Sequence, residues 1–174
     1  KVASTFRSFP GVSFPEHLCR LVNADLGSEV EKGTSEGDSV DMCIAYTNQV
    51  AAVDRDGNEM GGIRLPEICV PLGTHTGWNV RDLVISGQMI GLIGSTVPFL
   101  NTREAREASK DPRLSLEERY SSKASYLQQV REATQMLVGE AYLLEEDIER
   151  VLEASAQCYD LFTASAKEPQ RAAG

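Results

Sequence analysis

The chain has 174 residues, which is enough for one compact domain and too few for two of ordinary size. Its composition, 41% hydrophobic and 25% charged, is typical of a folded globular protein and excludes the disordered and collagen-like classes. The formal net charge of -9 opposes binding to phosphate backbones and anionic lipid, and no basic patch offsets it. We therefore expect a folded protein that does not bind nucleic acid.

The first forty residues contain prolines, glycines and a polar, acidic stretch at 27–39, without a helical or a strand period. This pattern predicts extended segments and loops. An alternating and then continuous apolar pattern follows over 42–53. The Asp56-Gly57 pair after it is typical of a tight hairpin turn, and residues 60–65 are expected to form the returning strand.

Two more apolar runs precede the helical part of the chain. Residues 68–72, bounded by Pro66 and Pro71, predict an edge or irregular strand, because proline cannot donate a hydrogen bond inside a sheet. Residues 83–100 are apolar enough to suggest a membrane span, but polar residues and Pro98 interrupt them. We expect a buried, glycine-rich segment there and no membrane span.

The last third of the chain has the signals of helices. Pro112 stands where a helix could begin, and residues 115–118 match the capping-box pattern. Apolar residues recur at helical spacing over 126–141 and again over 148–162. Two such stripes joined by a short connection predict an antiparallel helix pair. As an isolated piece the chain is therefore expected to be α+β, with N-terminal extended segments and a β-hairpin followed by this pair.

A serine-nucleophile signature is present but stands in the wrong context. Residues 33–37 match GxSxG with Ser35 at its centre, and Asp54 or Asp56 and then His75 complete the chain order of a hydrolase triad. The residues before Ser35 are charged where a buried strand is required, and the interval to His75 is too short for the intervening strands and helices. We assign no catalytic residue from these positions.

Metal and cofactor signals are also weak. The four cysteines are far apart and form no CxxC pair, so buried free thiols are favoured over disulfides or zinc. His17 and Cys19 are only two possible ligands without a third nearby. Residues 54–59 resemble the start of a calcium loop, but the glycine comes too early and no closing glutamate follows. We predict no metal and no cofactor.

The segment 73–81 is the strongest candidate for a binding loop, because it places an imidazole, an amide, a guanidinium and the single tryptophan among glycines. The candidate substrate-binding residues are His75, Thr76, Trp78, Asn79 and Arg81. The alternative is a structural turn in which Trp78 fills the core and Arg81 pairs with a carboxylate. Both interpretations remain open at this stage.

Several linked motifs resemble a known family. The segments 53–59, 62–67, 70–72 and 76–79 look like the signature near the C-terminus of the bacterial alpha/beta hydrolase domain-containing proteins. The resemblance continues in the same order on both sides of these segments. The further motifs are 9–12 and 14–15 upstream, and 98–99, 103–108, 111–113, 115–120 and 143–147 downstream. The similarity thus extends from about residue 9 to residue 162.

The resemblance implies the C-terminal part of an α/β-hydrolase fold in an intact protein several hundred residues long, with the nucleophile serine and catalytic histidine upstream. Residues 1–162 would then be an incomplete domain whose partner is the remainder of the hydrolase domain. The residues after 162 are small and polar, which predicts a disordered tail over 163–174. The implied reaction is hydrolysis of a small acyl ester or related acyl bond. The family usually has tyrosine where this chain has His75, which argues against a catalytic His75. The alternative is a stand-alone, non-enzymatic structural or protein-interaction module left by a split gene.

Overall fold

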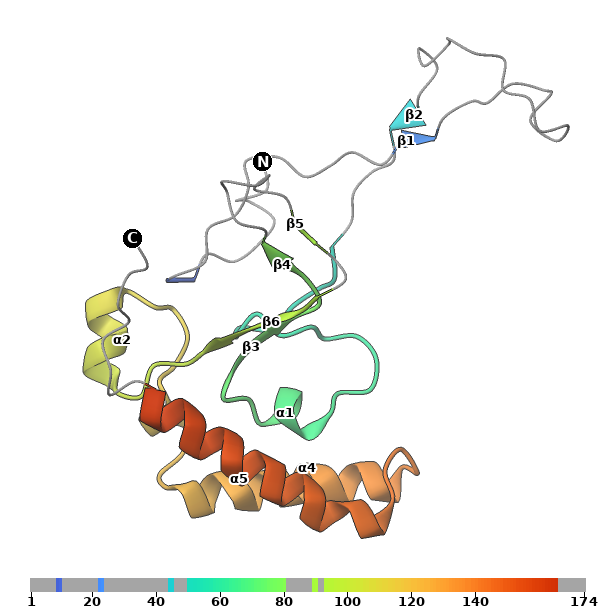
Figure 1. Ribbon diagram of the computed structural model, residues 1–174, viewed down its shortest axis with the longest axis vertical. Helices are drawn as coiled ribbons and strands as arrows, with labels where there is room; N and C mark the ends of the chain where they lie inside the picture. The colour runs from blue at the N-terminus through green and yellow to red at the C-terminus, as the bar shows by residue number, and fades with distance from the viewer. Residues whose placement is uncertain are drawn as a thin grey trace, which may run out of the picture.

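A computed structural model describes residues 9–10, 22–23, 44–45, 50–80, 89–90 and 93–165. Figure 1 shows a central strand pair, a short helix beneath it and a pair of long helices below that helix. The strands are β1 (Val22–Asn23), β2 (Ile44–Ala45), β3 (Gly73–Thr76), β4 (Asn79–Val80), β5 (Met89–Ile90) and β6 (Ser95–Pro98). The helices are α1 (Pro66–Cys69), α2 (Arg103–Ser109), α3 (Leu116–Arg119), α4 (Lys123–Gly139), the 3-10 helix η4 (Glu145–Asp147) and α5 (Ile148–Ser165).

The described strands form three antiparallel pairs, β1 with β2, β3 with β6 and β4 with β5. In the β3–β6 pair, Gly73 lies opposite Pro98 and His75 lies opposite Thr96. Gly73 must be glycine, because a Cβ there would lie 2.8 Å from the carbonyl oxygen of Val97. The structure mixes helices and strands, and an antiparallel strand pair is followed by helices. This confirms the expected α+β fold class.

The predicted turn at Asp56-Gly57 is present, closed by a single bridge between Val53 and Glu59. The Asp54 carboxylate accepts hydrogen bonds from the backbone N–H groups of Asp56 (2.9 Å) and Asn58 (3.0 Å), and Gly57 has φ +84°. The returning strand predicted at 60–65 is wrong. Gly61 and Gly62 bend the chain there, with Gly62 at φ +73°, so the pairing stops after one bridge.

The strand predicted at 68–72 is also wrong, because Pro66–Cys69 forms helix α1. Pro66 occupies the first helical turn, where its missing N–H costs nothing and its fixed φ favours the helix. A strand does begin next, but at Gly73. Short apolar runs fit either structure, and here the leading proline favours the helix.

The capping box at 115–118 is confirmed. Glu118 accepts hydrogen bonds from the backbone N–H of Ser115 (2.9 Å) and from its hydroxyl (2.7 Å), and α3 begins at Leu116. The start predicted at Pro112 is wrong, because Asp111 accepts a hydrogen bond from the backbone N–H of Arg113 (2.9 Å) and holds a turn instead.

The capping box also makes the folding stability depend on whether Glu118 is ionised. Hydrogen bonds from Ser115, with help from Arg106, lower the Glu118 pKa from 4.5 to about 2. Between these values the unfolded chain binds a proton that the folded chain does not, so folding stability falls as pH falls from about 5 to 2. We expect Glu118→Gln to flatten that part of the stability profile, measured by urea unfolding at each pH. Glu104→Gln, at an exposed position on α2, should leave the profile as in the wild type; equal profiles for the two variants would contradict this assignment.

Helices α4 and α5 form the predicted antiparallel pair. Lys123 near the start of α4 binds Asp160 near the end of α5 (2.6 Å), and Arg131 further along α4 binds Glu149 at the start of α5 (2.9 Å). Helix α5 continues to Ser165, beyond the boundary expected at 162, and the rest of the predicted tail lies outside the described residues.

The main hydrophobic core lies between the α4–α5 pair, α1, α3 and the segment before β3. Its buried members are Val70, Leu72, Phe99, Leu116, Tyr120, Tyr126, Val130 and Leu152.

Candidate functional site

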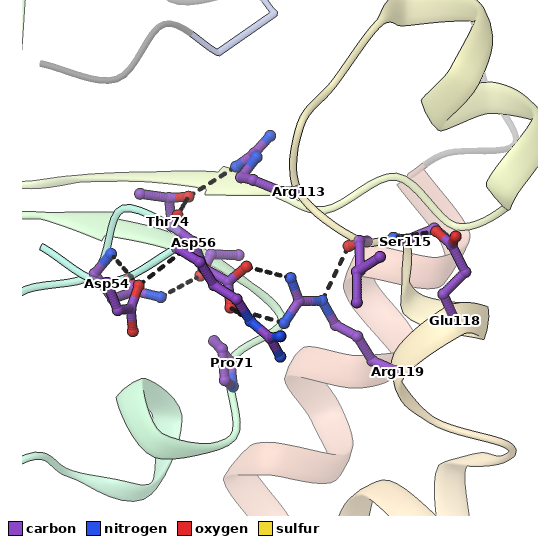
Figure 2. Close-up of polar contacts among 12 residues, drawn as sticks. Asp54, Asp56, Pro71, Thr74, Arg113, Ser115, Glu118 and Arg119 are labelled. Carbon is purple, nitrogen blue, oxygen red and sulfur yellow. Dashed lines mark hydrogen bonds and ion pairs between the residues drawn. The ribbon is translucent and has the colours of Figure 1, made fainter.

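A buried ion pair joins the 54–58 turn to helix α3 (Figure 2). The Arg119 guanidinium donates to both carboxylate oxygens of Asp56, one of them at 2.8 Å, and to the carbonyl of Leu114 at 2.9 Å. The two charged side chains are only 7% and 8% exposed. The guanidinium also stacks on Phe99, 4.0 Å from the ring centre. Because both partners are desolvated, each depends on the other for its charge to be tolerated.

A second buried ion pair lies beside the first. Arg113 donates to the two carboxylate oxygens of Asp111 at 3.0 and 2.7 Å, and the side chains are 2% and 3% exposed. Burial alone would raise the pKa of Asp111, but the hydrogen bonds and charge of Arg113 outweigh it and lower the pKa. Arg113 also donates to Thr74 (2.8 Å) and to the carbonyl of Val97 (2.9 Å), which ties the pair to both β3 and β6.

Thr74 and Asn58 connect these ion pairs to strand β3. The Thr74 hydroxyl accepts from Arg113 and donates to the carbonyl of Asp56 at 2.5 Å. The Asn58 side chain, fully buried, donates to the carbonyl of Gly73 (3.2 Å) and accepts from the backbone N–H of His75 (2.7 Å). We call Asp56, Asn58, Thr74, Asp111, Arg113 and Arg119 the polar network. Its groups bind one another and the backbone, so the network supports β3.

The structure places four of the five predicted binding residues on or next to β3 and β4. His75 and Thr76 are in β3, Trp78 follows them, and Asn79 begins β4; Arg81 lies outside the described residues. All four are half-buried.

Hydrogen bonds hold the turn between β3 and β4 in one shape. The Thr76 hydroxyl donates to the carbonyl of Trp78 (2.5 Å) and lies 2.6 Å from the hydroxyl of Ser95. The Ser95 hydroxyl also donates to the carbonyl of Trp78, at 3.2 Å. The candidate residues therefore lie on a hydrogen-bonded segment, and its first strand, β3, includes Thr74 of the polar network.

His75 is not arranged as the base of a triad with the acids considered above. Its Nδ1 lies 3.1 Å from the Thr96 hydroxyl, whereas Asp54 binds Arg64 (2.7 Å) and Asp56 binds Arg119. Burial lowers the pKa of His75, and the charge of Glu67 opposes this only partly, so the neutral imidazole is favoured. Ser35 lies outside the described residues.

Sequence reasoning missed a groove of about 680 Å³ beside the polar network. Its lining includes Asp56, Arg64, Cys69, Arg119 and Tyr120. All of them except Cys69 belong to segments that carry the family resemblance, and this resemblance is the signal in the sequence that could have found the groove. The prediction of buried thiols is wrong for Cys69 and for Cys158, which are free and exposed; the other two cysteines lie outside the described residues.

Within the described part of the chain, no three His, Cys, Asp or Glu side chains are grouped so that they could hold a metal ion. Of the helices described, none combines the length and the apolar character needed to cross a bilayer.

The fold and the polar network define a mixed α and β segment in which an antiparallel hairpin is fixed to helices by buried ion pairs. Residues 22–153 match the sequence model of the family described as "Alpha/beta hydrolase domain". This match covers most of the chain, and the chain belongs to the alpha/beta hydrolase domain family. No curated protein and no solved structure matches it.

Proposed function

We propose that this chain forms a C-terminal, non-catalytic layer of a hydrolase that acts on ester or related acyl bonds through a serine nucleophile located elsewhere in the domain. The segment 50–65 carries the argument. It buries Asp56 and Asn58 in the polar network yet exposes a series of large apolar side chains. These are Val50, Val53, Met60, Ile63 and Leu65, each between 38% and 58% exposed.

Such a concentration of exposed apolar side chains on an ordered segment favours a covering layer of protein. Membership in the alpha/beta hydrolase domain family favours the remainder of such a domain as the covering layer. In this arrangement His75, Thr76, Trp78, Asn79 and Arg81 would line part of the substrate pocket.

The test has two parts. The purified chain should hydrolyse p-nitrophenyl acetate and butyrate no faster than buffer, and Ser35→Ala and His75→Ala should change nothing. Turnover that both substitutions abolish would overturn the proposal and identify a triad within the chain. The chain should also co-purify with the upstream, sheet-bearing part of an alpha/beta hydrolase domain protein.

The surface that makes this contact can be tested by matched substitutions. Ile63→Asp should abolish the co-purification, because it places a charge in an apolar contact. Met136→Asp should leave the co-purification intact, because Met136 lies on α4 and outside the segment 50–65. Its side chain is even more exposed than that of Ile63, at 67% against 54%. Self-association of the chain without any binding to the hydrolase part would instead favour a stand-alone interaction module.

A further inference from the structure

The groove beside the polar network lies between the 54–58 turn, helix α1 and the residues of α3. Part of its lining is buried and held in place by polar contacts (Figure 2). Asp56 and Arg119 form a buried ion pair there, and the hydroxyl of Tyr120 donates to the carbonyl of Pro71 at 2.8 Å. The base of the groove therefore has a fixed shape.

Met60 joins this groove to the exposed apolar side chains of the segment 50–65. It lines the groove, belongs to that segment and is 58% exposed. Ile68 and Cys69 of α1 also line the groove, and the Cys69 thiol is free and exposed. A layer of protein that covers 50–65 would therefore also meet the groove.

The carboxylates that line the groove in the described part of the chain are all paired with arginines. The pairs are Asp54 with Arg64 (2.7 Å), Asp56 with Arg119, and Glu118 with Arg106 (2.8 Å). Arg55 also lines the groove, but its side chain is 75% exposed, so solvent screens its charge. A charged group that entered the groove would lose water without meeting an unpaired opposite charge. The groove thus favours an uncharged occupant.

Arg64 lines the groove with incomplete hydrogen bonding. Its Nη2 donates to the Asp54 carboxylate and, at 3.1 Å, to the carbonyl of Ile68. Its Nε is buried and has no hydrogen-bond partner among the described residues. Such a donor is rare in folded proteins, because it has lost water without gaining another acceptor. The side chain as a whole is still 31% exposed, so an acceptor that enters the groove can reach the guanidinium.

We propose that the remainder of the hydrolase domain inserts an uncharged segment into this groove, and that a backbone carbonyl of the segment accepts a hydrogen bond from the Arg64 guanidinium. A carbonyl supplies an acceptor without adding a charge, and an apolar side chain next to it would pack on Met60. This assignment rests on the proposed function, because it takes that domain as the layer covering 50–65.

The Cys69 thiol reports whether the groove is filled. We bind the wild-type chain to the upstream, sheet-bearing part of an alpha/beta hydrolase domain protein and add N-ethylmaleimide. Cys69 should then react more slowly than in the free chain, by about tenfold or more. Cys158 on α5 is also free and exposed, lies outside the groove and should react at the same rate in both. Peptide mass spectrometry follows the two thiols separately.

The two possible failures are distinguishable. If the complex forms and the Cys69 rate is unchanged, the insertion is overturned and the proposed function stands. If the wild-type chain does not bind the hydrolase part, the proposed function fails and the insertion fails with it.

Arg64→Lys tests the hydrogen bond. Lysine keeps a positive charge beside Asp54 but loses the planar set of guanidinium donors. Its affinity for the hydrolase part, measured by titration calorimetry, should fall by about tenfold, because a buried carbonyl is left without its donor. Arg103→Lys on α2 should leave the affinity unchanged.

Urea unfolding of the free Arg64→Lys chain separates partner binding from folding, because Arg64 also binds Asp54. A lower affinity with unchanged stability supports the proposal. Wild-type affinity, or a loss of affinity that is matched by a loss of stability, would overturn the role of Arg64.

Cys69→Trp tests the groove by filling it. The larger side chain should compete with the inserted segment and abolish co-purification, whereas Cys158→Trp on α5 should not. Equal co-purification of the two variants would contradict the insertion. The alkylation measurement uses the wild-type chain, so it decides the question even where a variant fails to fold.

Discussion

Arg119→Ala is expected to lower the free energy of unfolding by about 3–5 kcal/mol, the usual cost of leaving a buried charge without its partner. Asp56 is 8% exposed, and both of its carboxylate oxygens bind this guanidinium. The substitution also removes the stacking on Phe99 and the hydrogen bond to the carbonyl of Leu114. Urea unfolding of the purified chain, followed by circular dichroism, measures the change.

Arg103→Ala is the matched control, since Arg103 pairs with Glu107 on α2 at similar distance but with side chains 66% and 52% exposed. A pair so exposed contributes little to the free energy of unfolding, because solvent screens its charges. The double variant Asp56→Asn, Arg119→Met removes both buried charges and should recover part of the loss. If Arg119→Ala cost no more than Arg103→Ala, the pair would not stabilise the fold as described.

The features predicted correctly from the sequence are those whose causes lie close together in the chain. The capping box needs only residues 115–118, and the stripes of α4 and α5 need only the helical period. The turn at Asp56-Gly57 follows from the Asp-Gly pair itself, because glycine accepts the positive φ that Gly57 adopts in the structure. The strand expected at 68–72 was wrong because a short apolar run does not distinguish strand from helix.

The polar network could not be predicted in the same way. Its charge partners Asp56 and Arg119 are separated by 63 positions in the sequence, and Thr74 and Arg113 by 39. Neither periodicity nor composition pairs residues at such distances. Both arginines and both aspartates do fall within the motifs that carry the family resemblance, so the resemblance marked the right residues without showing that they meet. For the candidate segment 73–81, the sequence singled out His75 but gave no sign that Asn58 and Thr96 contact it.

Gly57→Ala is expected to destabilise the chain by about 3 kcal/mol through two separable effects. Gly57 has φ +84°, where an L residue costs about 1–2 kcal/mol. An added Cβ would also overlap the ring of Phe9 and lie 3.0 Å from the Thr74 side chain. The Phe9 ring cannot easily move away, because it is buried and lies 4.6 Å from the Arg113 guanidinium, so crowding adds about 1–3 kcal/mol.

Two other glycines separate these effects. Gly62 has φ +73° and open space around it, so Gly62→Ala should cost about 1–2 kcal/mol from the backbone alone. Gly61→Ala has open space and no positive φ, so the change should be within about 0.5 kcal/mol of zero. The difference between Gly57→Ala and Gly62→Ala, measured by urea unfolding, then reports the packing of Phe9 on the turn. Equal losses of stability for the two variants would mean that the Phe9 ring does not pack against Gly57.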